Sequence, residues 1–253
     1  PMWRQYGEKD MRVVDILPVQ LGVAMYPEHE KVKSLLIDEI KSHGDEYEHK
    51  KIDAVTKSLE HLDYYSPLSN DKYKEFREWI ELQAEIYAKD ILGYDTSEFM
   101  LTDSWVNVCD AGGKQLPHFH INSVVCALYY VNFDDSSHSP TYFYRPNESQ
   151  KYPDYYSYML TNHKHTKYND INEVVGLEGS LILWPSNCVH GYRTNHTDNR
   201  ITISSNLMPR YINSFEVMPL TKDERHTAMT TFRSGQLWDL SLIHISEPTR
   251  HGL

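Results

Sequence analysis

The feature that most constrains the fold is a change in the apolar pattern near residue 99. Before it, apolar residues recur at helical spacing, whereas after it the chain divides into short β-like segments separated by turn signals. Helices followed by six or more short strands predict a barrel or sandwich, a mainly β fold with helices packed outside. Strands are expected at 104–109, 118–132, 141–144, 181–184, 189–193 and 200–207.

Two helices are expected in the preceding part of the chain. The first begins at Pro27 and ends at Gly44, and the second begins at Asn70 or Asp71 and ends at Gly93. A strand at 13–26 and a polar loop with one short helix at 45–70 complete this region. The buried face of the second helix is expected to carry Phe76, Ile80, Ala84, Tyr87 and Ile91.

A chain of 253 residues is expected to form one domain over 1–239, with a helical part at 27–93 and a β core at about 99–210. The net charge of −11, without a basic cluster, argues against nucleic acid as the main partner. The chain contains no run of about 18 apolar residues, so no membrane span is expected. The three cysteines lack CxxC spacing and suit buried thiols in a reducing compartment, so we expect a cytoplasmic protein.

Residues 240–253 are expected to be non-native. They include the string LSLIHISEPTR, which resembles the translation of a transposase adapter used in sequencing libraries. A read-through of this kind is typical of an assembled metagenomic sequence. His244 and His251 are therefore left out of the candidate site.

Three histidines could hold a metal ion. His118 and His120 are two residues apart and share a face if their segment is extended. His190, from a neighbouring strand, could complete the set, and imidazole suits iron, zinc, copper and nickel. A closed structural zinc site would need a fourth ligand, usually a thiolate. The pattern therefore favours an open metal site.

Arg200 follows His190 by ten residues and opens the next expected strand. Its guanidinium could hold the far carboxylate of a small diacid bound to the metal through a bidentate, charge-assisted pair. Thr202 and Ser204 share the face of Arg200 and could add hydroxyl donors.

Three segments carry a resemblance to a known family. The string PHFHINSVVCALYYVN resembles H-x-H-x-N-S-x-x-S-G-x-Y-Y-V, and SWVN at 104–107 also fits. The string EGSLILWPSNCVHGYRTNHTDNRITISSN resembles a second block that ends in R-I-S-I-S-F-N, with Trp184 at a Phe position in a turn that orients His190. Over 104–207 the chain thus resembles a 2-oxoglutarate/Fe(II) oxygenase family of marine bacteria and phages, related to the prolyl 4-hydroxylase superfamily.

The resemblance implies a double-stranded β-helix, or jelly-roll barrel, with Fe(II) at its mouth. The usual triad is His-x-Asp/Glu with a distal His. Here His120 stands where the carboxylate is expected. Either His118, His120 and His190 form a three-histidine triad, or His120 is the first ligand and Asn122 takes the carboxylate position.

Two further residues are expected to contact 2-oxoglutarate. Tyr130 is the inward tyrosine if it shares a face with Val124, Cys126 and Leu128, and the superfamily uses such a tyrosine on the distal carboxylate. Asn107 could reach the cosubstrate from the adjacent strand.

The resemblance implies a dioxygenase that hydroxylates a substrate and releases succinate and CO₂. No paired carboxylates for acid–base catalysis are evident, which agrees with this chemistry. Two alternatives stay open: a three-histidine cupin-like dioxygenase that does not use 2-oxoglutarate, and a non-catalytic jelly-roll binding module. The substrate, a small molecule or a peptide, is not defined by the sequence.

Overall fold

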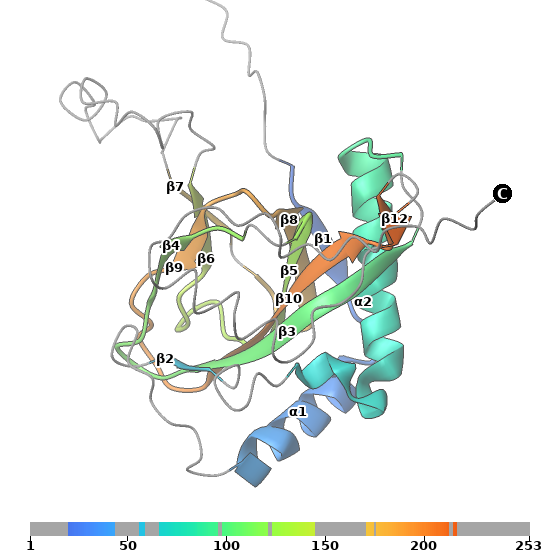
Figure 1. Ribbon diagram of the computed structural model, residues 1–253. Coiled ribbons are helices and arrows are strands. Elements are labelled where there is room, and N and C mark those ends of the chain that lie inside the picture. The colour runs from blue at the N-terminus through green and yellow to red at the C-terminus, as the bar shows by residue number, and fades with distance from the viewer. Residues whose placement is uncertain are drawn as a thin grey trace, which may run out of the picture.

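Two antiparallel β-sheets face each other, and two helices cover the outside of the larger sheet (Figure 1). This mainly β architecture with flanking helices confirms the expected fold class. The computed structural model describes residues 20–43, 56–58, 66–95, 98–120, 123–144, 171–174, 176–212 and 215–216.

The larger sheet has the strand order β1-β8-β5-β10-β3-β2. Its members are β1 Gly22–Met25, β2 Thr56–Ser58, β3 Phe99–Cys109, β5 Val125–Asn132, β8 Ser180–Pro185 and β10 Arg200–Pro209. The strand β5 is apolar on both faces because both are buried. Cys126, Leu128 and Tyr130 face the interior of the barrel. Val124, expected on the same face, precedes β5 and packs against other apolar clusters.

The smaller sheet has the order β4-β9-β6-β7. Its strands are β4 Gln115–His118, β6 Thr141–Tyr144, β7 Ile171–Val174 and β9 His190–Tyr192. His118 lies opposite His190, and His190 lies opposite Phe143. A separate two-stranded ribbon joins β11 Tyr211–Ile212 to β12 Phe215–Glu216.

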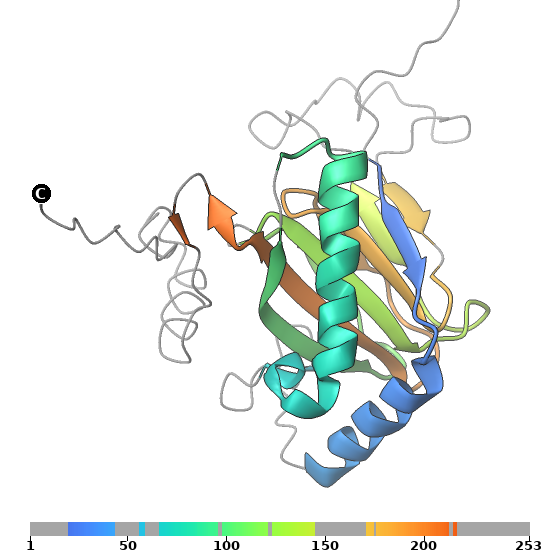
Figure 2. The same ribbon diagram turned by 90° about the vertical axis from the view of Figure 1, so that its right-hand side faces the viewer.

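The helices α1 (His29–His43) and α2 (Lys74–Ile86) lie against the outer face of the larger sheet (Figure 2). Phe76, Ile80 and Ala84 are spaced by four residues and pack on the outward side chains of β5. Short 3₁₀ turns at Pro67–Ser69 (η3) and Asp71–Tyr73 (η4) lead into α2, and the Asn70 side chain accepts a hydrogen bond from Lys72 N at 3.1 Å.

The end of α2 differs from the expectation. The helix passes into a π-helical turn, η5 (Tyr87–Ile91), in which Leu92 N donates to Tyr87 O. A π turn adds one residue to the turn and so rotates the later side chains around the helix axis. Ile91, expected on the buried face, is therefore 44% exposed. The end of the helical region at Gly93 is confirmed by its φ of +71°.

Two expectations for the strands were wrong. The segment 118–132 is not one strand, because β4 ends at His118 and β5 begins at Val125 in the other sheet. The region 45–70, expected to be a loop with one short helix, also contains the strand β2 at Thr56–Ser58. The chain has to cross between sheets in the first case, and a periodicity count does not show such a crossing.

Several expectations lie outside the described residues. These are most of the strand at 13–26, the stop at Gly44, and the tail at 240–253. Within the described part, no helix has the length and apolar character needed to cross a membrane.

Candidate active site

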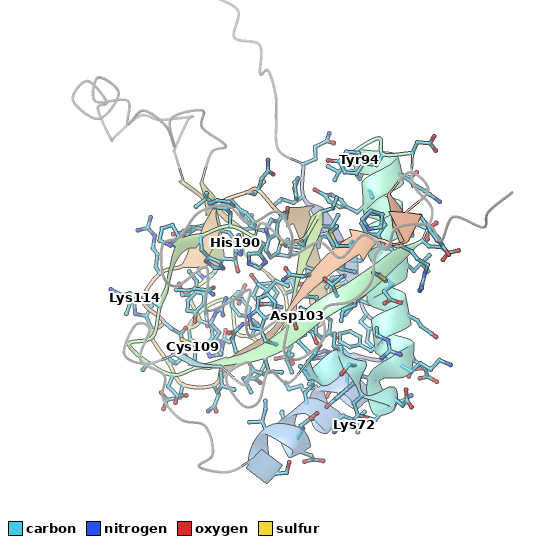
Figure 3. All side chains as sticks on the ribbon, viewed as in Figure 1. Lys72, Tyr94, Asp103, Cys109, Lys114 and His190 are labelled. Atoms are coloured by element: carbon cyan, nitrogen blue, oxygen red, sulfur yellow. The ribbon has the colours of Figure 1, made fainter. Side chains whose placement is uncertain are left out.

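Three imidazoles converge where β4 and β9 meet. His118 ends β4 and is paired with His190 at the start of β9, while His120 follows two residues after β4. Their candidate ligand atoms all lie within 4.8 Å of one another. Figure 3 shows His190 between the two sheets. His120 thus reaches the cluster from beyond the strand, not from the extended segment that the sequence predicts.

Hydrogen bonds orient two of the three rings. His190 Nδ1 lies 2.9 Å from the Cys188 carbonyl oxygen, and His120 Nδ1 lies 2.5 Å from Asn206 Oδ1. Because both oxygens only accept, Nδ1 carries the proton in each ring. The Nε2 lone pairs of His120 and His190 are then free for a metal. Asn206 is a part of this site that sequence reasoning missed.

Burial keeps two of the three imidazoles, His120 and His190, neutral. It is the main cause that lowers the pKa of His120 to about 4, and the nearby His118 lowers that pKa further. Burial also lowers the pKa of His190 well below its ordinary value. Neutral imidazole is the form that binds metal. By contrast, burial raises the pKa of the Cys126 thiol to about 12, so that this thiol stays protonated and is a poor ligand.

The alternative triad, with Asn122 in the carboxylate position, falls outside the described residues. What the structure does place together is the three-histidine set. Each of its members remains a predicted ligand.

Arg200 lies deep in the barrel at the start of β10, with 1% of its surface exposed. Its Nε donates to the Ser139 carbonyl oxygen at 2.9 Å, and its guanidinium carbon lies 4.1 Å from the centre of the Tyr192 ring. Among the described residues, Nη1 and Nη2 have no hydrogen-bond partner. A buried cation with two unused donors is costly unless an anion completes it.

One cavity joins Arg200 to the imidazoles. Thr202 also faces it, and the buried Thr202 hydroxyl has no partner within the described part of the chain. Asn107 Nδ2 donates to Ser204 Oγ at 3.2 Å on the same lining. The other lining residues are Trp105, Gln115, Ala127, Leu128, Thr141, Trp184 and Tyr192.

Tyr130 stands beside Arg200 and does not line this cavity. Its ring centre is 5.9 Å from the Arg200 guanidinium carbon, and its hydroxyl contacts Thr141 Oγ1 at 2.7 Å. Burial raises the pKa of Tyr130 despite the neighbouring guanidinium, so the phenol is neutral. Contact between Tyr130 and a cosubstrate therefore stays a prediction.

These residues fit a metal ion together with a dicarboxylate. Tyr192, under the Arg200 guanidinium, follows His190 by two residues on β9. Two strand residues span roughly 7 Å. Neutral nitrogen ligands at one end and unsatisfied cationic donors at the other can therefore hold a short chain with an acid group at each end.

Comparison with known proteins agrees with a site for a metal ion and a dicarboxylate. The family described as "Putative 2OG-Fe(II) oxygenase" matches residues 103–206. A prolyl-4-hydroxylase of Pseudomonas putida superposes with a TM-score of 0.50 at 10% identity, over 76% of this chain and 94% of that one. The comparison with curated proteins gave no match.

Two further solved structures share the fold. AviO1 from Streptomyces viridochromogenes Tue57 has a TM-score of 0.51 at 12% identity, over 75% of this chain and 90% of AviO1. The epimerase SnoN, in complex with Fe³⁺, alpha ketoglutarate and nogalamycin RO, has a TM-score of 0.51 at 12% identity, over 80% of this chain and 89% of SnoN. At such identities the likeness concerns the fold alone.

Residues 103–206 thus match the model of the 2OG-Fe(II) oxygenase family, and the fold is similar to that of the Pseudomonas putida prolyl-4-hydroxylase. The double-stranded β-helix expected from the sequence is thereby confirmed. The expected phage or metagenomic origin finds no support in these matches.

Proposed function

We propose that the protein is an Fe(II)- and 2-oxoglutarate-dependent dioxygenase that hydroxylates a substrate and releases succinate and CO₂. The observation that carries this proposal is the buried Arg200 guanidinium, whose two terminal nitrogens lack partners among the described residues in the same cavity as three imidazoles. Arg200 and Thr202 would bind the distal carboxylate, and His118, His120 and His190 would hold the iron.

When bound, Fe(II) supplies oxygen activation coupled to decarboxylation of 2-oxoglutarate. The chain's own residues position the reactants and limit water. Three neutral imidazoles leave the 2+ charge of the metal to be balanced by the two carboxylates of the cosubstrate. Trp105 and Trp184, both at most 9% exposed, provide apolar walls around the cluster.

The test is succinate release from 2-oxoglutarate with Fe(II) and O₂, without added substrate. Arg200→Ala should abolish succinate release and leave anaerobic Fe(II) binding intact, because Arg200 is not a ligand. Arg193→Ala is the matched control, since Arg193 is exposed and paired with Glu173 at 2.8 Å outside the cavity. This control should retain wild-type release.

The third imidazole, in place of a carboxylate, favours one rival: a three-histidine dioxygenase that does not use 2-oxoglutarate. Under that rival, Arg200→Ala would still consume O₂, and 2-oxoglutarate would make no difference. Failure to bind Fe(II) at all, with no succinate formed, would instead indicate a non-catalytic barrel.

A further inference from the structure

The Trp184 indole is a buried donor without an acceptor. Trp184 lies on β8 and is 2% exposed, and its Nε1–H has no hydrogen-bond partner among the described residues. The residue nevertheless lines the cavity that contains Arg200 and the imidazoles. Unpaired buried donors are rare in native proteins and usually indicate a missing partner.

Trp184 lies at the metal end of the cavity. It pairs across the sheet with Cys126, which pairs with Asn206, the residue that orients His120. The Trp184 and His190 ring centres are 4.7 Å apart in an edge-to-face arrangement. The indole is therefore a neighbour of the group that the metal would hold.

Arg200 marks the opposite end, over Tyr192 and roughly 7 Å further along β9. A ligand that fills the cavity thus has one terminus at Arg200 and the other beside Trp184. An indole N–H can only donate, so its partner has to be an acceptor. An anionic oxygen is the strongest one.

We propose that Trp184 is a cosubstrate-binding residue whose indole N–H donates to the carboxylate at the oxo-acid end of 2-oxoglutarate. This inference rests on the proposed function and extends it to a second anchor. The family block that the sequence resembles has Phe at this position, so the donor is a feature of this chain.

The affinity test uses the Zn²⁺-loaded protein, which binds ligand without turnover, and isothermal titration with 2-oxoglutarate or pyruvate. Pyruvate keeps the oxo-acid end and lacks the distal carboxylate. Trp184→Phe should lower the affinity for both ligands by about tenfold or more, because a hydrogen bond to a charged group is lost. Arg200→Met should weaken 2-oxoglutarate and leave pyruvate unchanged.

Trp79→Phe is the matched control, because Trp79 packs on Tyr26 and Phe76 in the helical layer. Its affinities should equal those of the wild type. Wild-type affinity for 2-oxoglutarate in Trp184→Phe, with Arg200→Met impaired, would overturn the role of Trp184 and leave the proposed function standing. If the wild-type protein binds the metal but does not bind 2-oxoglutarate, both the role of Trp184 and the proposed function are overturned.

A second measurement does not depend on the folding of any variant. The chain has 5 tryptophans, so a ¹⁵N-labelled wild-type protein gives few indole resonances. Addition of 2-oxoglutarate to the Zn²⁺ form should move the assigned Trp184 indole proton downfield and slow its exchange with solvent. An unchanged Trp184 resonance under saturating 2-oxoglutarate would overturn the inference.

Discussion

At the scale of single residues, the orientation of His120 depends on the Asn206 amide. Asn206 is 3% exposed and its Oδ1 accepts from His120 Nδ1 at 2.5 Å. We expect Asn206→Leu to lower the affinity for Zn²⁺ or Co²⁺ by about 10–100-fold, because the ring loses the bond that fixes its tautomer. Competition with a chromophoric chelator measures this change.

Two variants sharpen that experiment. Asn206→Asp keeps the acceptor and should bind metal at least as tightly as the wild type. Cys188→Ala should also bind normally, because His190 is held by the main-chain carbonyl of Cys188 and not by its thiol. Equal affinities in Asn206→Leu and the wild type would show that packing alone orients His120.

The neutral imidazoles make the metal-free protein sensitive to acid. The pKa of His120 is lowered to about 4, whereas an imidazole in the unfolded chain titrates near 6.5. Between these pH values the unfolded chain binds a proton that the folded chain does not. The contribution of neutral His120 to the free energy of unfolding is therefore fully present above pH 6.5 and is lost as the pH falls toward 4.

We expect the metal-free protein to lose up to about 2 kcal/mol of its unfolding free energy through His120 between pH 7 and pH 5. Urea denaturation at the two pH values measures the loss. His120→Gln should flatten the dependence, while the shift of His190 in the same direction leaves part of it. An equal pH dependence in wild type and variant would contradict this account.

At the scale of elements, the segment that leads into β8 can pass close to Tyr130 because Gly176 has no side chain. A Cβ at Gly176 would lie 2.1 Å from the Tyr130 ring, which itself stands beside Arg200. Gly176→Ala should therefore displace Tyr130, lower stability by about 1–3 kcal/mol and weaken 2-oxoglutarate binding. Thermal unfolding and ligand titration give the two results.

Gly93→Ala is the comparison for that variant. Gly93 has a φ of +71°, and apart from its chain neighbours no atom of the described residues lies within 4 Å of a Cβ there, so alanine strains only the backbone. It should lower stability by about 1–2 kcal/mol without changing 2-oxoglutarate affinity. Equal loss of affinity in both variants would mean that reduced stability, not Tyr130, is the cause.

The spacing of apolar residues along the chain predicted most of the helices and strands, because each of these elements buries its side chains at a regular interval. The segment 141–144 and the strand that starts at Arg200 agree with the structure. The rules fail where the backbone leaves regular geometry. The π turn rotates Ile91 out of its stripe, and the crossing after His118 moves β5 to the other sheet.

At the scale of the whole molecule, the site connects the two sheets. His118 and His190 belong to the smaller sheet, whereas Arg200 and Asn206 belong to the larger one. A metal and a dicarboxylate bound together would bridge them. We expect 2-oxoglutarate to raise the melting temperature only when Zn²⁺ is present, by the equivalent of about 2.7 kcal/mol at 100 times the dissociation constant.

Differential scanning fluorimetry with Zn²⁺ or with a chelator tests this coupling. His190→Ala should abolish the effect of 2-oxoglutarate, and glutarate, which lacks the oxo group, should have a smaller one. Stabilisation by 2-oxoglutarate that persists in the chelator would indicate a binding mode that does not involve the metal.

The site itself was predictable only in part. His190 begins β9 and Arg200 begins β10, the strand that follows it along the chain, so their short separation in sequence translates into proximity. Asn206 contacts His120, and Trp184 packs beside His190. Neither contact lies within one strand, so both depend on register. The register between strands that are far apart in the sequence is set when they pair in the folded protein, and it cannot be predicted from one sequence.

The buried guanidinium of Arg200 has a kinetic consequence. It attracts anions at short range, yet it sits in a chain of net charge −11. Long-range repulsion, which extends about 8 Å at physiological ionic strength, should slow the approach of a doubly charged acid. Added salt would screen that repulsion, and it would screen the buried contacts between Arg200 and the bound acid far less. Association should therefore speed up as ionic strength rises while dissociation stays nearly constant, so that this cavity would capture its ligand faster in brine than in dilute buffer.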